Sequence, residues 1–140
     1  MRLDNLPFPV FGDTSFRGKC PKEYVEQASI INRIRKDFPD TWGLLVLHPR
    51  NEGLKEGGQF STVLKHKAEG MAVGASDVVI PASVAFVCEV KRLDHTLSAW
   101  QPGQVPYLTA AHDAGAFACV ALGAVGAWEA FEAWRASLVA

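Results

Sequence analysis

Three charged residues lie in a stretch of sequence that is otherwise apolar. Asp77 precedes "VVIP", and Glu89 and Lys91 fall within "VAFVCEVK", residues 84–91. Because side chains alternate across a β-strand, Glu89 and Lys91 project from the same face, roughly 7 Å apart. The short connection "PAS" favours an antiparallel hairpin, which brings Asp77 next to the other two residues. The sequence therefore predicts two carboxylates and one ammonium group at one end of a sheet.

This combination of groups suits metal-assisted chemistry. A buried carboxylate without a partner is costly, and two neighbouring carboxylates repel each other. A divalent cation relieves both penalties, and hard oxygen ligands favour Mg²⁺ or Mn²⁺ over zinc. Lys91 beside such an ion can hold or deprotonate a water molecule that the metal has made more acidic. Taken singly, Asp77 is typical of a turn residue, and Glu89 with Lys91 is typical of a solvated ion pair.

The rest of the chain predicts the elements that hold this hairpin. Hydrophobic periodicity together with proline and glycine positions indicates helices and strands in a definite order. We expect a helix at 21–37, a strand at 41–49, a segment at 59–68 that favours a helix over a strand, strands at 77–81 and 84–92, a helix at 104–114, a strand at 116–123 and a helix at 127–139. This order predicts an α/β fold, αβ(α)ββαβα, in which a mixed sheet of about four strands is flanked by helices.

The composition is that of one ordinary globular domain. The chain has 140 residues, of which 49% are hydrophobic and 21% are charged, and this is enough to bury a full core. Residues 1–19 contain two prolines, two glycines and three phenylalanines, which predicts an irregular arm fixed by aromatic side chains. We therefore divide the chain into an N-terminal arm at 1–19 and a single domain at 20–140.

Charge and cysteine content exclude several classes of protein. The formal net charge of -1 argues against a histone-like protein that holds nucleic acid by bulk positive charge. The three cysteines lack CxxC spacing, and Cys88 and Cys119 lie in strand-like runs, so we expect buried free thiols in a reducing compartment and no structural zinc. The longest apolar run is too short and too rich in glycine to span a bilayer, so we expect a cytoplasmic protein with no membrane partner.

The charged hairpin also resembles a known signature. "SDVVIP" followed by "CEVK" resembles the Asp…Glu-x-Lys motif of the PD-(D/E)XK nuclease superfamily, and the surrounding sequence resembles its VRR-NUC branch, the virus-type replication and repair nucleases, in a phage-like form. The resemblance covers residues 20–125. It includes Glu23 and Gln27 in the first helix, Asn51 in "HPRNEG", the glycines of "EGMAVGASD", and "LSAWQPGQVPYLTAAHDAG", in which a helix ends at glycine.

Two departures from the family pattern bear on the site. The segment after Lys91 contains two glutamines, Gln101 and Gln104, and the distance to Gly115 favours Gln104 as the family glutamine while leaving Gln101 as the alternative. Ser76 stands where the superfamily name has proline, at a position that varies in the superfamily.

The resemblance implies a restriction-endonuclease-like core and a metal-dependent endonuclease that hydrolyses DNA phosphodiester bonds. It implies branched, flap or Holliday junction DNA as substrate, in replication, recombination or repair, in a bacterial or phage-infected cytosol. A homodimer would match the two symmetric scissile sites of a junction. The implied ligands for Mg²⁺ or Mn²⁺ are Asp77, Glu89, the Val90 carbonyl and Glu23. The implied catalytic residues are Asp77, Glu89, Lys91, Glu23 and Gln104. The residues expected to contact DNA are Gln27, Arg50, Asn51, Lys67 and Arg92, with His48 and His66 the histidines most suited to do so.

The helix residues of the motif have a physical basis of their own. Glu23 and Gln27 lie one turn apart on one side of the first helix, and Ile30 and Ile34 continue this row toward the core. Glu23 can therefore complete a metal shell or position a water. The alternative is an ordinary solvated glutamate in the first turn, favoured by the helix dipole. Glu26 competes for the same role but faces away from this row.

Two other functions compete with a nuclease. A catalytically silent DNA-binding or scaffolding module would keep the fold but lose at least one catalytic group, whereas this chain keeps all of them. An interaction domain could instead use the three charges as a buried ion network that neither binds Mn²⁺ nor depends on it.

Overall fold

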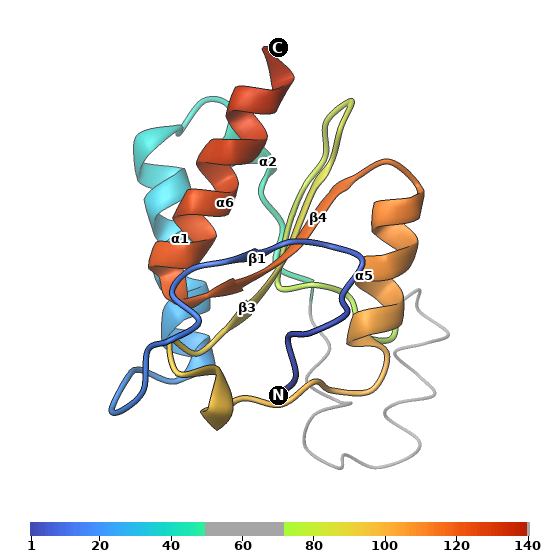
Figure 1. The fold of residues 1–140 in the computed structure, drawn as a ribbon. Coiled ribbons are helices and arrows are strands. Elements are labelled where there is room, and N and C mark those ends of the chain that lie inside the picture. The colour runs from blue at the N-terminus through green and yellow to red at the C-terminus, as the bar shows by residue number, and fades with distance from the viewer. Residues whose placement is uncertain (50–71, 140) are drawn as a thin grey trace, which may run out of the picture.

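The protein is described by a computed structural model that covers residues 1–49 and 72–139. Its centre is a four-stranded sheet in the order β1-β4-β3-β2 (Figure 1). β4 runs parallel to both β1 and β3, and β2 runs antiparallel to β3. The strands are β1 (Val10–Phe11), β2 (Val78–Ile80), β3 (Phe86–Lys91) and β4 (Phe117–Leu122). The predicted mixed sheet and the α/β fold are confirmed.

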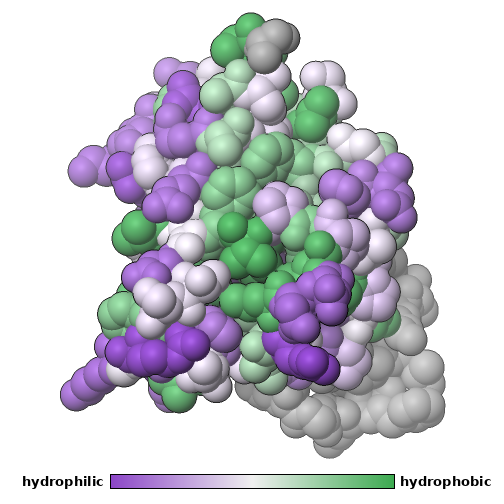
Figure 2. All heavy atoms as spheres, viewed as in Figure 1, coloured by the Kyte–Doolittle hydropathy of each residue, from purple (hydrophilic) through white to green (hydrophobic). Residues whose placement is uncertain are grey.

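Helices cover both faces of the sheet. The α-helices are α1 (Glu23–Asp37), α2 (Trp42–Leu45), α5 (Gln104–Asp113) and α6 (Gly123–Leu138), and a 3-10 helix η1 covers His95–Leu97. α1 and α6 pack on one face and α5 packs on the other (Figure 1). In the same view, hydrophobic side chains gather along the middle of the molecule, between α6 and α5, and hydrophilic ones cover its sides (Figure 2).

Two apolar layers result, and β3 contributes to both. Phe86, Cys88 and Val90 join the layer beneath α1 and α6. Val87 joins the smaller layer beneath α5. The alternation predicted from the sequence is therefore correct. It places Glu89 and Lys91 on the α5 face, and all six residues of the strand are buried.

The predicted strand at 41–49 is wrong. Its first half forms the short helix α2, and only Leu47 pairs with the sheet, through a bridge to Val79. Gly43 explains the difference, because its N–H donates to the Phe38 carbonyl at 2.7 Å and a Cβ atom there would lie 2.6 Å from the same oxygen. Only glycine can come this close to the end of α1, so the chain turns into a helix before it reaches the sheet.

The last helix begins earlier than predicted. α6 starts at Gly123 rather than at residue 127, directly after β4. Gly123 has a φ of +72°, a left-handed conformation that lets the chain pass from strand to helix without a loop. The segment at 59–68 lies outside the described residues.

The N-terminal segment is irregular, as predicted, but it also supplies a strand. Val10 and Phe11 pair in parallel with Val120 and Ala121, so β1 covers one edge of the sheet. Phe8 is buried and meets Trp100 edge to face, at 6.3 Å between ring centroids. Two residues are too few for a strand pattern to be visible in the sequence, and their strand character comes from β4.

The cysteines are free thiols in the structure. Cys88 and Cys119 are buried and lie opposite each other on β3 and β4, and Cys20 is half-buried. None of the helices in residues 1–49 and 72–139 has the length and apolar character that a membrane crossing would need.

Candidate functional site

Strand β2 begins at Val78, so its pairing with β3 does not extend to the charged residues of β3. Asp77 directly precedes β2 and lies at this end of the pairing. The pair Val78 and Cys88 is the last in the register, and continuing the register places Asp77 beside Glu89. The Asp77 carboxylate accepts the N–H of Val90 at 3.0 Å. In a continued antiparallel ladder a backbone carbonyl would accept that N–H. The side chain of Asp77 thus takes the place of the next backbone acceptor in the ladder, and Asp77 is buried, with 3% of its surface exposed.

The backbone of Val90 therefore faces the gap left by β2. The N–H and C=O of one strand residue point to the same side of the strand. Since the Val90 N–H reaches Asp77, the Val90 carbonyl opens on the same side. A carboxylate and a backbone carbonyl are thereby presented together at the end of the sheet.

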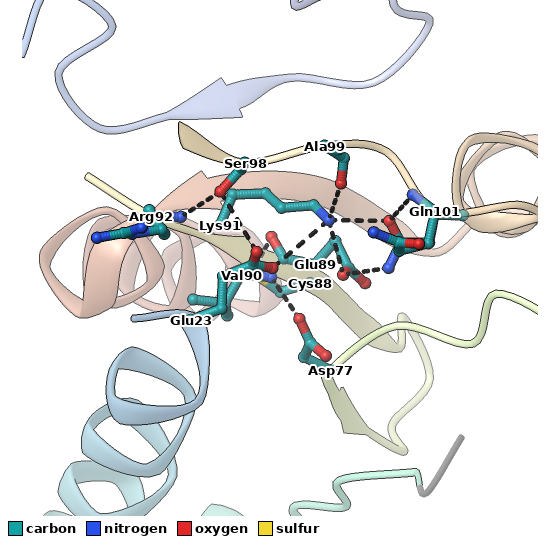
Figure 3. Close-up of polar contacts among 11 residues, drawn as sticks. Glu23, Asp77, Cys88, Glu89, Val90, Lys91, Arg92, Ser98, Ala99 and Gln101 are labelled. Carbon is teal, nitrogen blue, oxygen red and sulfur yellow. Dashed lines mark hydrogen bonds and ion pairs between the residues drawn. The ribbon is translucent and has the colours of Figure 1, made fainter. Parts of the chain in front are cut away.

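The Lys91 ammonium lies at the centre of the polar cluster (Figure 3). It donates to the Ala99 carbonyl at 2.8 Å and to Oε1 of Gln104 at 2.9 Å. Oε1 of Glu23 lies 3.5 Å from Nζ, and Oε1 of Glu89 lies 3.6 Å from it. Lys91 is 1% exposed and Glu89 is fully buried. Burial of this kind is tolerated only when the charges are paired and hydrogen-bonded.

Gln104 connects the two sides of this cluster. Its Oε1 accepts from Lys91 and from the backbone N–H of Gln101 at 2.8 Å, while its Nε2 donates to Oε1 of Glu89 at 2.7 Å. Both ends of the amide are therefore used, and its orientation is fixed. Of the two glutamines that the sequence left open, Gln104 places its side chain in the cluster. Gln101 contributes its backbone and has an exposed side chain.

A contact between two glycines sets the position of Gln104. Gly74 has a φ of +74°, and a Cβ atom there would lie 2.1 Å from the carbonyl carbon of Gly103. Gly103 has a φ of +88°, and a Cβ atom on it would lie 2.8 Å from Cγ1 of Val73. The chain before Asp77 therefore packs backbone against backbone on the first turn of α5. This contact explains Gly74 before the acidic residue, and Gly70 lies outside the described residues.

Carboxylates outnumber cations in the cluster. Among the described residues, Glu23 and Glu89 lie beside the ammonium of Lys91, and the Asp77 carboxylate accepts the neighbouring N–H of Val90. The pKa of Cys88 is raised well above its ordinary value, first by a hydrogen bond with Cys119, then by burial, and further by the negative charges of Asp77 and Glu89. A divalent cation would neutralise the surplus.

The donor set fits a hard cation that takes only part of its shell from the protein. Within residues 1–49 and 72–139, no three His, Cys, Asp or Glu side chains form a group that could hold a metal by themselves. The available donors are the carboxylates of Asp77 and Glu89 and the carbonyl of Val90. Mg²⁺ and similar ions commonly bind one or two carboxylates and keep several waters. The residues present are therefore compatible with such an ion.

Glu23 approaches from the first turn of α1. Its side chain is 30% exposed and reaches both Lys91 and Ser98, whose Oγ donates to Oε2 of Glu23 at 3.4 Å. Gln27 is half-buried one turn further along α1. Glu26 points elsewhere, as the sequence indicated, because its carboxylate accepts the N–H of Ala124 at the start of α6 at 3.3 Å.

The remaining predicted DNA contacts have mixed outcomes. Arg92 directs its guanidinium at the backbone carbonyls of Cys20 and Pro21, at 2.8 and 3.1 Å. Arg50, Asn51 and Lys67 lie outside the described residues, as does His66.

Three residues near the cluster were not predicted to belong to it. Nδ1 of His48 lies 2.7 Å from the Asp77 carbonyl, so Nδ1 carries the proton. Ser98 bridges Arg92 and Glu23. The Lys91 ammonium lies over the Trp100 ring, 5.4 Å from its centroid. In the sequence, Ser98 and Trp100 belong to "LSAWQ" and His48 belongs to "HPRNEG". Their contacts with the cluster could not be predicted, because they depend on the folded arrangement.

The fold has a known relative among solved structures. A protein described as "VRR_NUC domain protein" has a TM-score of 0.65 to this chain, with 18% sequence identity, over 81% of this chain and 88% of the other. No protein-family model matches the sequence, and no curated protein matches it. The chain therefore has a VRR-NUC-like fold.

Proposed function

We propose that this protein is a metal-dependent nuclease of the VRR-NUC branch of the PD-(D/E)XK superfamily, which hydrolyses DNA phosphodiester bonds. One observation carries the proposal: the side chains of Glu23, Asp77, Glu89, Lys91 and Gln104 meet at the end of β3, although they come from four separate segments. These are the residues that the nuclease resemblance singles out. An ion network with no chemical role has no reason to reproduce that set.

Mg²⁺ or Mn²⁺ is the proposed cofactor, held by Asp77, Glu89 and the Val90 carbonyl, with Glu23 completing the shell. When bound, such an ion polarises the phosphate and lowers the pKa of a bound water. The charge balance of the cluster supports this assignment, because its described residues include three carboxylates and one ammonium, that of Lys91, and only Glu23 and Glu89 pair with that ammonium.

Lys91 orients the attacking water in this proposal. Ala99 and Gln104 accept two of its three N–H groups, and the third would hold a water beside the Glu23 and Glu89 carboxylates, which lie 3.5 and 3.6 Å from the nitrogen. Gln104 fixes the positions of the Lys91 and Glu89 side chains relative to each other, because its amide forms a hydrogen bond with each of them.

The substrate is proposed to be branched, flap or four-way junction DNA in replication, recombination or repair. This finer step rests on the VRR-NUC resemblance. A homodimer would place two such clusters on the two strands of a junction, and the bacterial or phage-infected cytosol is the proposed setting.

Cleavage of labelled linear, flapped and four-way junction DNA in Mg²⁺, Mn²⁺ or EDTA tests the proposal. Wild type should cut in either metal and not in EDTA. Glu89→Gln and Lys91→Gln should lower cleavage by about a hundredfold or more, since each removes a charge at the reacting phosphate. Glu26→Gln is the matched control, because it alters a buried glutamate that contacts α6 instead of the cluster.

Cooperative thermal unfolding of each variant separates lost chemistry from a lost fold. If the Glu89→Gln and Lys91→Gln variants are folded and cut DNA as well as wild type, the assignment of these residues to the active site is wrong. If wild type binds DNA but cuts none of the substrates in either metal, the silent DNA-binding module is the better description.

A further inference from the structure

We propose that Arg92 is a positioning residue for the reaction and not a contact to DNA: it holds the start of α1 so that Glu23 stays against Lys91. This inference rests on the proposed nuclease function. It replaces the expectation that the arginine next to the catalytic lysine binds a phosphate.

The guanidinium donates to two carbonyls of the protein backbone. Nη2 of Arg92 donates to the Cys20 carbonyl at 2.8 Å, and Nε donates to the Pro21 carbonyl at 3.1 Å. Two parallel donors on a planar group fix direction as well as distance, which a lysine cannot do. Both carbonyls lie just before α1, while Arg92 directly follows Lys91. One side chain therefore ties the end of β3 to the start of α1.

The start of α1 depends on this support. Its N-cap residue is Lys22, which makes no side-chain capping bond. A helix without such a cap lacks one of the interactions that commonly fix its first turn. Glu23 is the first residue of this turn, and its side chain is 30% exposed, so water competes for its carboxylate. Fixing the backbone immediately before Glu23 reduces the conformations that this side chain can adopt.

A second connection runs from the Arg92 backbone to the same glutamate. The N–H of Arg92 donates to Oγ of Ser98 at 3.1 Å, and that hydroxyl donates to Oε2 of Glu23 at 3.4 Å (Figure 3). The other oxygen of Glu23 lies 3.5 Å from Nζ of Lys91. Arg92 thus restrains Glu23 twice, through the backbone before it and through its carboxylate.

The loop after Arg92 holds the same N-terminal segment at a further point. Oδ2 of Asp94 accepts the N–H of Gly18 at 3.0 Å. Residues 18–21 are therefore bound to the exit of β3 at both ends. This arrangement uses backbone groups of the N-terminal segment, so it positions main chain.

The consequence for the reaction is specific. If Glu23 moves by about an ångström, Lys91 loses one of its two carboxylate neighbours, and misplacement on this scale can lower a rate by about a hundredfold. DNA affinity should not change, because no phosphate contact is removed. The expected signature is a lower kcat with an unchanged KM.

Arg92→Lys and Arg92→Gln test this inference against the DNA-contact alternative. Arg92→Lys keeps the positive charge but loses the two-donor geometry, so both variants should lower kcat by roughly 10- to 100-fold. KM and the salt dependence of DNA binding, measured in EDTA, should match wild type. A phosphate contact predicts the reverse: Arg92→Gln would weaken binding and reduce the slope of log K against log salt by about one, while Arg92→Lys would retain most of the affinity. Arg35→Gln, on the exposed side of α1, is the control.

A double variant tests whether Arg92 acts through Glu23. Glu23→Gln alone should lower kcat, and Arg92→Lys combined with Glu23→Gln should be little worse than Glu23→Gln, since residues that act as one unit are not additive. Hydrogen exchange over residues 18–27 should be faster in Arg92→Lys and unchanged in Arg35→Gln.

Additive losses in the double variant, or an unchanged kcat with weakened DNA binding, would overturn the positioning role. A failure of the proposed function itself would give a different result. Wild type would then cleave no DNA, and Arg92→Lys would change only the rate of hydrogen exchange over residues 18–27.

Discussion

Strands β3 and β4 lie side by side in the interior, yet only β3 carries charge. Their register pairs Glu89 with Val120 and Lys91 with Leu122. Every side chain of β4 is apolar, and the strand is buried from its second residue to its last. β4 is flanked by β1 and β3, whereas the last residues of β3 extend past the end of β2.

The difference shows that position in the sheet decides where a charge can be buried. At the open end of β3, the first turns of α1 and α5 bring Glu23 and Gln104 to the charged side chains. No comparable polar group is needed beside β4. Replacing a buried ion pair by apolar residues is often neutral or stabilising. The apolar side chains of β4 therefore show that a buried strand of this sheet needs no charge to fold. The proposed function gives a reason for the charges of β3.

Moving a charge from β3 to β4 should produce the largest effect. Val120→Asp places a carboxylate beside Glu89 and among Phe8, Val87 and Leu108, with no cation supplied for it. An uncompensated buried charge costs about 3–5 kcal/mol, a large part of the stability of a typical domain. We therefore expect a strongly reduced urea midpoint or a protein that does not fold.

Val120→Thr is the matched control, because it has nearly the same shape and adds a hydroxyl group without a charge. Its cost should be about 1–3 kcal/mol, the penalty for an unpaired polar group. If Val120→Asp were as stable as Val120→Thr, the interior beside β4 would accept charge as β3 does, and the contrast between the strands would fail.

Separating α5 from the loop before Asp77 should give the next largest effect. Gly74→Ala forces a Cβ atom to within 2.1 Å of Gly103, so the first turn of α5 must shift and carry Gln104 with it. We expect a loss of about 1–3 kcal/mol in stability and reduced cleavage. Gly115→Ala is the matched control, since Gly115 also has a positive φ, of +96°, but nothing lies within 4 Å of the added atom.

Thermal unfolding and cleavage should be measured on both glycine variants. The control isolates the cost of the left-handed conformation, so the excess in Gly74→Ala reports the contact with α5. Equal losses in the two variants would show that this contact does not position the site.

The charged hairpin was predictable because its signals are local. Alternation with a period of two placed Glu89 and Lys91 on one face, and the short connection fixed an antiparallel partner. The glycines before Asp77 and the spacing from Gln104 to Gly115 also lie within short segments. The predicted convergence of the side chains follows from these features, and the structure places them together.

Other features could not be predicted because they depend on distant partners. Arg92 is separated by 72 positions from Cys20, whose carbonyl it binds, and no pattern in the sequence connects the two. The residues at 42–45 have strand-forming side chains, but the approach of Gly43 to α1 makes them helical. β1 is a strand only because β4 offers an edge. In each case tertiary contact decides between conformations that local preference leaves open.

The smallest effect concerns the acid stability of the loop that follows β3. The pKa of Asp94 is lowered below its ordinary value, first by a hydrogen bond from the Thr96 hydroxyl and then by the N–H of Gly18. A carboxyl group with a lowered pKa in the folded state stabilises the protein above its unfolded-state pKa, and this contribution disappears as the pH falls through the folded-state pKa. Asp94→Asn should therefore be slightly less stable than wild type at neutral pH, and the two should converge in acid below the ordinary value of 3.8. Urea unfolding across this pH range measures the difference, with Asp113→Asn at the exposed end of α5 as the control. A difference that persisted unchanged into acid would mean that Asp94 supports the loop by shape and not by charge, and the exit of β3 would then resemble β4 in needing no ionised group for stability.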